Sequence, residues 1–146
     1  MAEAILREVT LALPMAPDME LEASKTAAAI AESIRMSPDR IDEVRQALIE
    51  ACINALEHSH AVDREVFVTF QVVGASGARD PEKLRILVSD HGVGFSPDRV
   101  TEPDITQKMS SGYFRGWGLK LIRGLMDEVE IQTGPGGTTV VMVKMR

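Results

Sequence analysis

A carboxylate and an amide lie four residues apart in the segment Glu50–His58, which has the sequence EACINALEH. On an α-helix this spacing places Glu50 and Asn54 one turn apart on the same face. Stacked in this way, the two side chains can hold a divalent cation and orient a nucleophile beside it. A solvated polar helix face is the simpler alternative, and for this pair taken alone it is the favoured interpretation.

A second cluster, SDHGVGF, directly follows a segment whose residues predict a strand. Asp90 ends that strand, where a carboxylate can accept a hydrogen bond from an exocyclic amino group such as that of adenine. Gly92 and Gly94 allow close backbone approach and unusual backbone angles. The motif differs from the G-x-G-x-x-G of a dinucleotide fold and from a Walker P-loop, which needs Gly-Lys-Ser/Thr. An ordinary Asp-x-Gly turn is the alternative.

A third cluster, RGWGL, lies where a long loop is expected to meet a short helix. Glycines at a helix N-terminus, here Gly116 and Gly118, expose backbone N–H groups and the positive end of the helix dipole, which suits phosphate oxygens. Arg115 and Lys108 can add positive charge at this place. The alternative is a flexible loop in which the glycines serve only for turning.

Hydrophobic periodicity predicts the elements that would position these clusters. Strands are predicted over residues 4–13, 65–73, 84–89, 129–133 and 138–145, and helices over residues 18–35, 38–58 and 118–126. Because two helices precede paired strands, the order favours an α+β fold, a two-layer α/β sandwich with helices on one face of a mixed, mostly antiparallel sheet. The segment 91–115 shows little periodicity, and a stretch of that length is usually functional and often a lid.

Length and composition fit a single domain, which we expect to span residues 1–146. A net charge of −6 and an aromatic content of 4% are unlike those of a nucleic-acid-binding protein, so we expect no direct contact with DNA or RNA. Cys52 is the one cysteine of the sequence and is expected to be packed rather than reactive. Without a long apolar run or a basic leader, the sequence predicts a cytoplasmic protein that does not enter a membrane.

Together the three clusters resemble the nucleotide-binding motifs of the GHKL ATPase superfamily, which includes gyrase, heat-shock chaperone, histidine kinase and mismatch-repair ATPases. Glu50–His58 resembles the N box of that superfamily, Asp90–Phe95 its G1 box and Gly116–Leu119 its G2 box. The segment GGTTV, which contains Thr139, resembles the strand that ends the nucleotide site.

Within this superfamily the chain resembles the anti-sigma-factor serine/threonine protein kinases of bacterial partner-switching systems. The resemblance rests on the E-A-x-x-N-A-x-x-H form of the N box, the compact length, the sequence MDEV after the last helix, and GGTTV near the C-terminus. It covers almost the whole chain, from the first strand to Lys144. Its fold is the two-layer sandwich that the order of elements also favours.

The resemblance implies a role for each motif in binding ATP and Mg²⁺. Asn54 would coordinate the Mg²⁺ ion that bridges the ATP phosphates, and Glu50 would be the general base that activates a serine or threonine hydroxyl of a protein substrate. Asp90 would bind the adenine amino group, with Gly94 supporting the pocket, and Gly92 is a further candidate nucleotide-binding residue.

The remaining nucleotide contacts implied by the resemblance come from the later part of the chain. Residues 96–115 would form the ATP lid, which closes to exclude water. Arg115 is the candidate for the lid arginine that reaches the γ-phosphate. The other candidate nucleotide-binding residues are Lys108, Gly116, Gly118, Leu119 and Thr139.

The implied function is that of an ATP-dependent protein serine/threonine kinase that phosphorylates an anti-sigma-factor antagonist and sequesters a sigma factor or another target protein. Two alternatives stay open: a nucleotide-dependent protein-binding switch with weak catalysis, and a detached histidine-kinase ATPase domain. Many members of the family act as dimers, so a homodimer formed through the first strand or the first helix is a further candidate.

Overall fold

The computed structural model describes residues 2–58, 64–77, 79–91 and 114–146. In chain order its elements are β1 (Glu3–Pro14), α1 (Met19–Ser33), α2 (Pro38–His58), β2 (Glu65–Ala75), β3 (Lys83–Asp90), α5 (Phe114–Leu125), β4 (Glu128–Gly134) and β5 (Gly137–Met145). The predicted order of strands and helices is confirmed. The main difference in bounds is that α5 begins at Phe114, one turn before the predicted start at Gly118.

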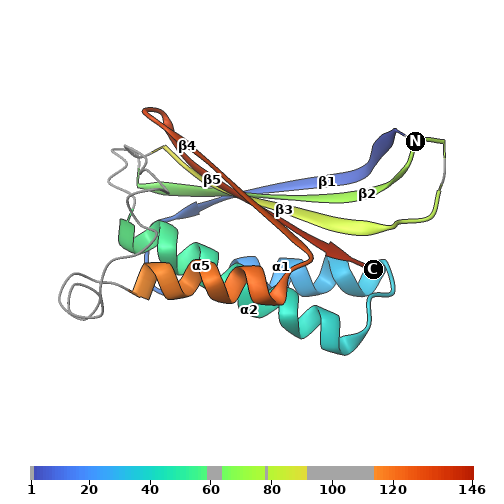
Figure 1. The fold of residues 1–146 in the computed structure, drawn as a ribbon, viewed down its shortest axis with the longest axis horizontal. Coiled ribbons are helices and arrows are strands. Elements are labelled where there is room, and N and C mark those ends of the chain that lie inside the picture. The colour runs from blue at the N-terminus through green and yellow to red at the C-terminus, as the bar shows by residue number, and fades with distance from the viewer. Residues whose placement is uncertain (1, 59–63, 78, 92–113) are drawn as a thin grey trace.

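The described strands form one sheet in the order β1-β2-β3-β5-β4, and each neighbouring pair is antiparallel. The helices α1, α2 and α5 lie side by side against one face of this sheet (Figure 1). The predicted α+β sandwich is therefore confirmed, although the described sheet is antiparallel throughout rather than mixed. Among the described residues, no helix has the length and apolar character needed to cross a membrane.

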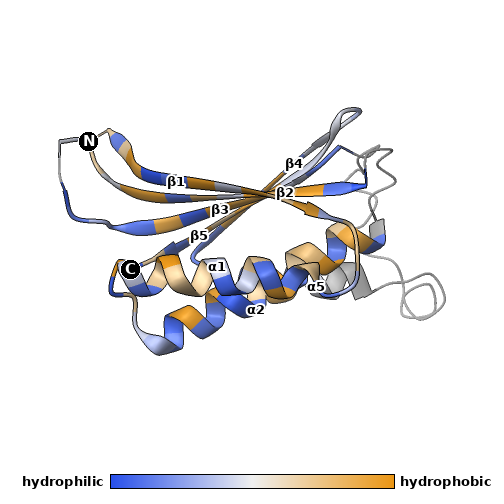
Figure 2. Ribbon diagram, turned by 180° about the vertical axis from the view of Figure 1, so that it is seen from behind, coloured by the Kyte–Doolittle hydropathy of each residue, from blue (hydrophilic) through white to orange (hydrophobic). Residues whose placement is uncertain are grey.

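The hydrophobic core lies between the sheet and the helix layer. Buried and less buried side chains alternate along β3 and along most of β2, and both strands are rich in hydrophobic residues (Figure 2). The helices contribute stripes of apolar residues spaced three or four apart, as expected for one buried helix face. The largest fully buried apolar side chains include Phe70, Leu48, Leu84, Ile86, Ile122 and Met142.

This topology gathers the predicted motifs at one end of the molecule. The C-terminal end of α2, the C-terminal end of β3, the N-terminal end of α5 and the turn between β4 and β5 all lie there, at the left in Figure 1. Residues that are far apart in the sequence thus come from four elements to the same edge of the sandwich.

Candidate functional site

The centre of the candidate site is a contact between α2 and α5. Glu50 and Asn54 lie one turn apart on α2, as their spacing predicts, and α5 crosses them at Gly118. A Cβ atom added to Gly118 would lie 2.9 Å from Glu50 Oε1 and 2.9 Å from Asn54 Nδ2. Because Cβ atoms do not approach other atoms that closely, a glycine is needed at residue 118 for the two polar side chains to stay in place.

The position of Glu50 and Asn54 follows from the pattern of α2. Its buried stripe includes Val44, Leu48 and Ala51, and the two polar residues are rotated from that stripe to the border of the core. Both are therefore half-buried, beside the fully packed helix interface. A carboxylate and an amide in this position stay partly exposed, at the end of the sandwich where the predicted motifs lie.

The donor chemistry of this pair suits Mg²⁺ that is held mainly by a bound nucleotide. Mg²⁺ prefers oxygen ligands and usually keeps waters and substrate phosphates, with one or two ligands from the protein. Among the described residues, no group of three or more His, Cys, Asp or Glu side chains converges as a metal site. One amide oxygen from Asn54 fits the small contribution that the protein makes to such a site, and the carboxylate of Glu50 lies one turn away as a proton acceptor.

Asp90 is fixed at the end of β3 by the start of β5. Gly137 has φ +129°, and a Cβ atom added there would lie 2.0 Å from the backbone oxygen of Asp90. The close approach of these two backbones is possible only with glycine. Since side chains alternate along a strand and Val88 is buried, the side chain of Asp90 points to the side covered by the helices.

The predicted nucleotide-binding residue Thr139 is not on that side of the sheet. Its Oγ1 lies 2.8 Å from Ser89 Oγ, so the pair occupies the face away from the helices. Thr138 is directly opposite Asp90 in the β3–β5 ladder, is 8% exposed, and its Oγ1 lies 3.0 Å from Thr133 Oγ1. Thr138 is therefore the threonine that shares the helix side with Asp90.

The remaining predicted residues fall into two groups. In α5, Arg115 and Gly116 belong to the first four residues, whose backbone N–H groups have no acceptor within the helix, whereas Gly118 is the fifth. Leu119 is half-buried and packs against the core. Gly92, Gly94 and Lys108 lie outside the described residues. The expected lid does too, except for its last two residues, which are part of α5.

The chain is similar in sequence to proteins of a known family. The chain matches the family model described as "Histidine kinase-like ATPase domain" over residues 13–144. It is 29% identical over 145 residues to the serine-protein kinase RsbW of Bacillus subtilis, an alignment that covers 93% of this chain and 84% of that protein. It is 36% identical over 129 residues to RsbW of Bacillus licheniformis, with 82% and 73% covered.

The fold also has a counterpart among solved structures. The crystal structure of the RsbU and RsbW domains of a Mycobacterium tuberculosis protein aligns with a TM-score of 0.67 at 20% identity. The alignment covers 95% of this chain and 32% of the other, so the chain spans about a third of that structure. At this identity the likeness concerns the fold alone.

Proposed function

This chain belongs to the histidine kinase-like ATPase domain family and, within it, to the group of the RsbW serine-protein kinases, and we propose that it is itself an ATP-dependent protein serine/threonine kinase. The observation that carries the proposal is the meeting of Glu50, Asn54 and Gly118 between α2 and α5. It places a proton acceptor and an oxygen ligand for a cation beside the amino end of a helix, which is the end that attracts phosphate.

In the proposed reaction Glu50 accepts the proton of a serine or threonine hydroxyl on a protein substrate. The hydroxyl oxygen then forms a bond to the γ-phosphorus of ATP, the bond from that phosphorus to its bridging oxygen breaks, and ADP leaves. Asn54 would hold Mg²⁺ through its side-chain oxygen, and the bound ion would neutralise charge on the phosphates. The rest of the catalysis is positioning by the protein.

The nucleotide is proposed to bind through the sheet, at the end of β3, and through the helix layer, at the start of α5. The carboxylate of Asp90 accepts a hydrogen bond from the adenine amino group, with Thr138 beside it on β5. The N–H of Gly116 in the first turn of α5 donates to phosphate oxygens. The residues Gly92, Gly94, Lys108 and Arg115 keep the roles that the family resemblance gives them, and the segment 96–115 is proposed as the lid of one domain spanning residues 1–146.

The proposed partners follow from the partner-switching family. The substrate is an anti-sigma-factor antagonist, and the sequestered protein is a sigma factor or another regulated target. A homodimer is part of the proposal. We place the reaction in the cytoplasm, where ATP and these partners are available.

The test combines nucleotide binding with phosphate transfer. The chain is incubated with γ-labelled ATP, Mg²⁺ and an antagonist protein that co-purifies with it. We expect label on a serine or threonine of the antagonist. Glu50→Gln should keep ATP affinity within about twofold and reduce transfer by about a hundredfold or more, the scale of a lost general base. Asp42→Asn, which changes an exposed carboxylate on the same helix, should leave both properties unchanged.

Three results would overturn the kinase proposal in different ways. Nucleotide-dependent capture of the antagonist without transfer would favour the protein-binding switch. Acid-labile phosphate on the product would favour a histidine-kinase ATPase domain. Absence of ATP binding by the unaltered chain would contradict every reading of the site as a nucleotide site.

A further inference from the structure

A lysine is buried at the end of α5 that is distant from the candidate site. Lys144 of β5 is 5% exposed and points to the helix side of the sheet, in line with the core residues Val140 and Met142. Lysine is almost never fully buried unless its ammonium group has partners. Its burial in a strand that supplies mainly apolar side chains to the core therefore needs an explanation.

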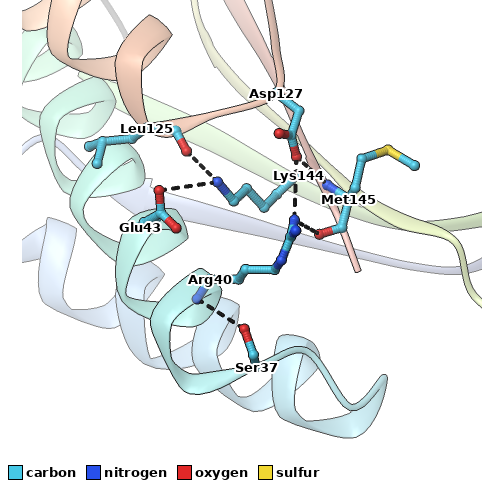
Figure 3. Close-up of polar contacts among 7 residues, drawn as sticks. All are labelled: Ser37, Arg40, Glu43, Leu125, Asp127, Lys144 and Met145. Atoms are coloured by element: carbon cyan, nitrogen blue, oxygen red, sulfur yellow. Dashed lines mark hydrogen bonds and ion pairs between the residues drawn. The ribbon is translucent and has the colours of Figure 1, made fainter.

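The ammonium group of Lys144 joins three elements (Figure 3). Its Nζ donates a hydrogen bond of 2.5 Å to the carbonyl oxygen of Leu125, the last residue of α5. It also lies 3.4 Å from Oε2 of Glu43 on α2. The carbonyl groups of the last helical turn have no acceptor role within the helix, and a cation there also interacts favourably with the helix dipole.

The corner that follows α5 is held by further contacts to the same two elements (Figure 3). Asp127 Oδ2 accepts a 2.6 Å hydrogen bond from the backbone N–H of Met145 and lies 4.0 Å from Arg40 Nη1. Arg40 Nη1 in turn donates to the carbonyl oxygen of Met145 at 3.2 Å. Because the side chains of Arg40 and Asp127 are exposed and their charged atoms are 4.0 Å apart, their ion pair is weak, and the buried Lys144 is the stronger anchor.

The spacing of these contacts matches the spacing of the candidate site. On α2, Glu43 and Glu50 are seven residues apart, and on α5 Leu125 and Gly118 are also seven residues apart. Seven residues make about two helical turns, so each pair lies on one face of its helix, about 10 Å apart along the axis. The helices run in opposite directions, with Glu43 linked through Lys144 to Leu125 at one point and Glu50 touching Gly118 at the other.

We propose that Lys144 is a positioning residue for the nucleotide site, which sets the register of α5 along α2 so that Gly118 stays over Glu50 and Asn54. This inference rests on the proposed function, since it assigns the register a role in binding ATP. A helix moves as a rigid rod over two turns, so an axial or rotational shift at Leu125 reaches Gly118. A Cβ atom at Gly118 would already lie 2.9 Å from Glu50 Oε1 and Asn54 Nδ2, so a shift of α5 toward α2 displaces the ends of these two side chains.

The first arm of the test needs no nucleotide. Amide hydrogen exchange of α5 is compared with that of α1 in the unaltered chain and in Lys144→Met, which keeps the apolar stem and removes the donor. We expect α5 amides to exchange about tenfold faster or more while α1 amides keep their rates, the signature of local rather than global opening. Lys144→Arg, which restores a cation, should recover most of the protection, and Glu43→Gln should lie between.

The second arm measures the affinity for Mg²⁺-ATP at a temperature where all variants are folded. We expect Lys144→Met to weaken binding about tenfold, and the core variant Val68→Ala on β2 to lower stability without changing affinity. Faster exchange of α5 with unchanged affinity would overturn the positioning role, as would equal acceleration of α1 and α5. If Lys144→Met does not fold, the exchange rates of α5 and the affinity for Mg²⁺-ATP are compared between Glu43→Gln and Lys144→Arg instead.

The two arms separate this inference from the proposed function. Should the unaltered chain fail to bind Mg²⁺-ATP, the proposed function fails, and the exchange arm still decides whether Lys144 holds α5 in register.

Discussion

Gly118 of α5 lies so close to Glu50 of α2 that a Cβ atom at residue 118 would sit 2.9 Å from Glu50 Oε1. We predict that Gly118→Ala displaces Glu50 and Asn54 and weakens Mg²⁺-ATP binding about tenfold or more, because the contact of Asn54 with the ion is a charge-assisted one of about 1.5–3 kcal/mol. Isothermal titration calorimetry measures the change in affinity.

Gly124 provides the matched control within the same helix. A Cβ atom there would meet nothing within 4 Å, and the position is exposed. Because alanine favours a helix over glycine by about 1 kcal/mol, Gly124→Ala should raise the melting temperature and leave nucleotide affinity unchanged. Equal ATP affinities for the two alanine variants would contradict the importance of the close approach at Gly118.

A second glycine pair tests how Asp90 is held. At Gly137 the backbone has φ +129°, and a Cβ atom would lie 2.0 Å from the Asp90 oxygen, whereas at Gly136 it would meet nothing within 4 Å. Gly137→Ala should therefore lower stability by about 2 kcal/mol or more through strain and backbone movement. Gly136→Ala should stay within about 0.5 kcal/mol, as surface substitutions do. Urea unfolding of both variants gives the comparison, and similar losses for both would show that the β3–β5 contact is not tight.

Removal of the metal tests the assignment of Asn54. We expect chelation of Mg²⁺ to weaken ATP binding by the unaltered chain about ten- to a hundredfold, the range for a charge-assisted contact of about 1.5–3 kcal/mol. Asn54→Ala should bind ATP weakly with or without Mg²⁺, because the side-chain oxygen that would bind the ion has been removed. Gln46→Ala, an exposed change on the same helix, should keep the full dependence on Mg²⁺. A normal response to Mg²⁺ in Asn54→Ala would exclude this residue as a ligand.

Contacts within one element were predictable from the sequence, and contacts between elements were less so. The spacing of Glu50 and Asn54 places them together on α2 because a helix has a fixed period. That Gly118 is the residue above them depends on the register between α2 and α5, which buried contacts such as that of Lys144 with Leu125 determine. No local pattern in the sequence encodes that register.

Two further differences have local causes. The sequence prediction missed the first turn of α5 because Gly116 and Gly118 lower the helix propensity of this segment. The position of Thr139 on the face of the sheet away from the helices could have been recognised from the sequence. Strand alternation with Val140 and Met142 groups Thr138, not Thr139, with the core-facing residues.

The thiol of Cys52 gives a prediction about pH. Burial within α2 raises the pKa of this thiol to about 12, and the negative charge of Glu20 adds to the effect. We therefore expect alkylation by iodoacetamide to be very slow near pH 8 in the folded chain and to become fast in urea, where the pKa returns to about 8.5. Mass spectrometry of the alkylated fraction follows this directly.

The same pKa shift fixes the direction in which stability depends on pH. Because the folded chain holds the thiol proton more tightly than the unfolded chain, this contribution to stability is complete below about pH 8.5 and is lost as the pH rises towards about 12. The free energy of unfolding is measured at pH 8 and pH 10 for the unaltered chain and for Cys52→Ala. The difference between the two proteins separates the contribution of the thiol from that of other groups that titrate in this range. The unaltered chain should lose more stability than the variant between the two pH values, and parallel losses would show that the thiol is not shielded from water.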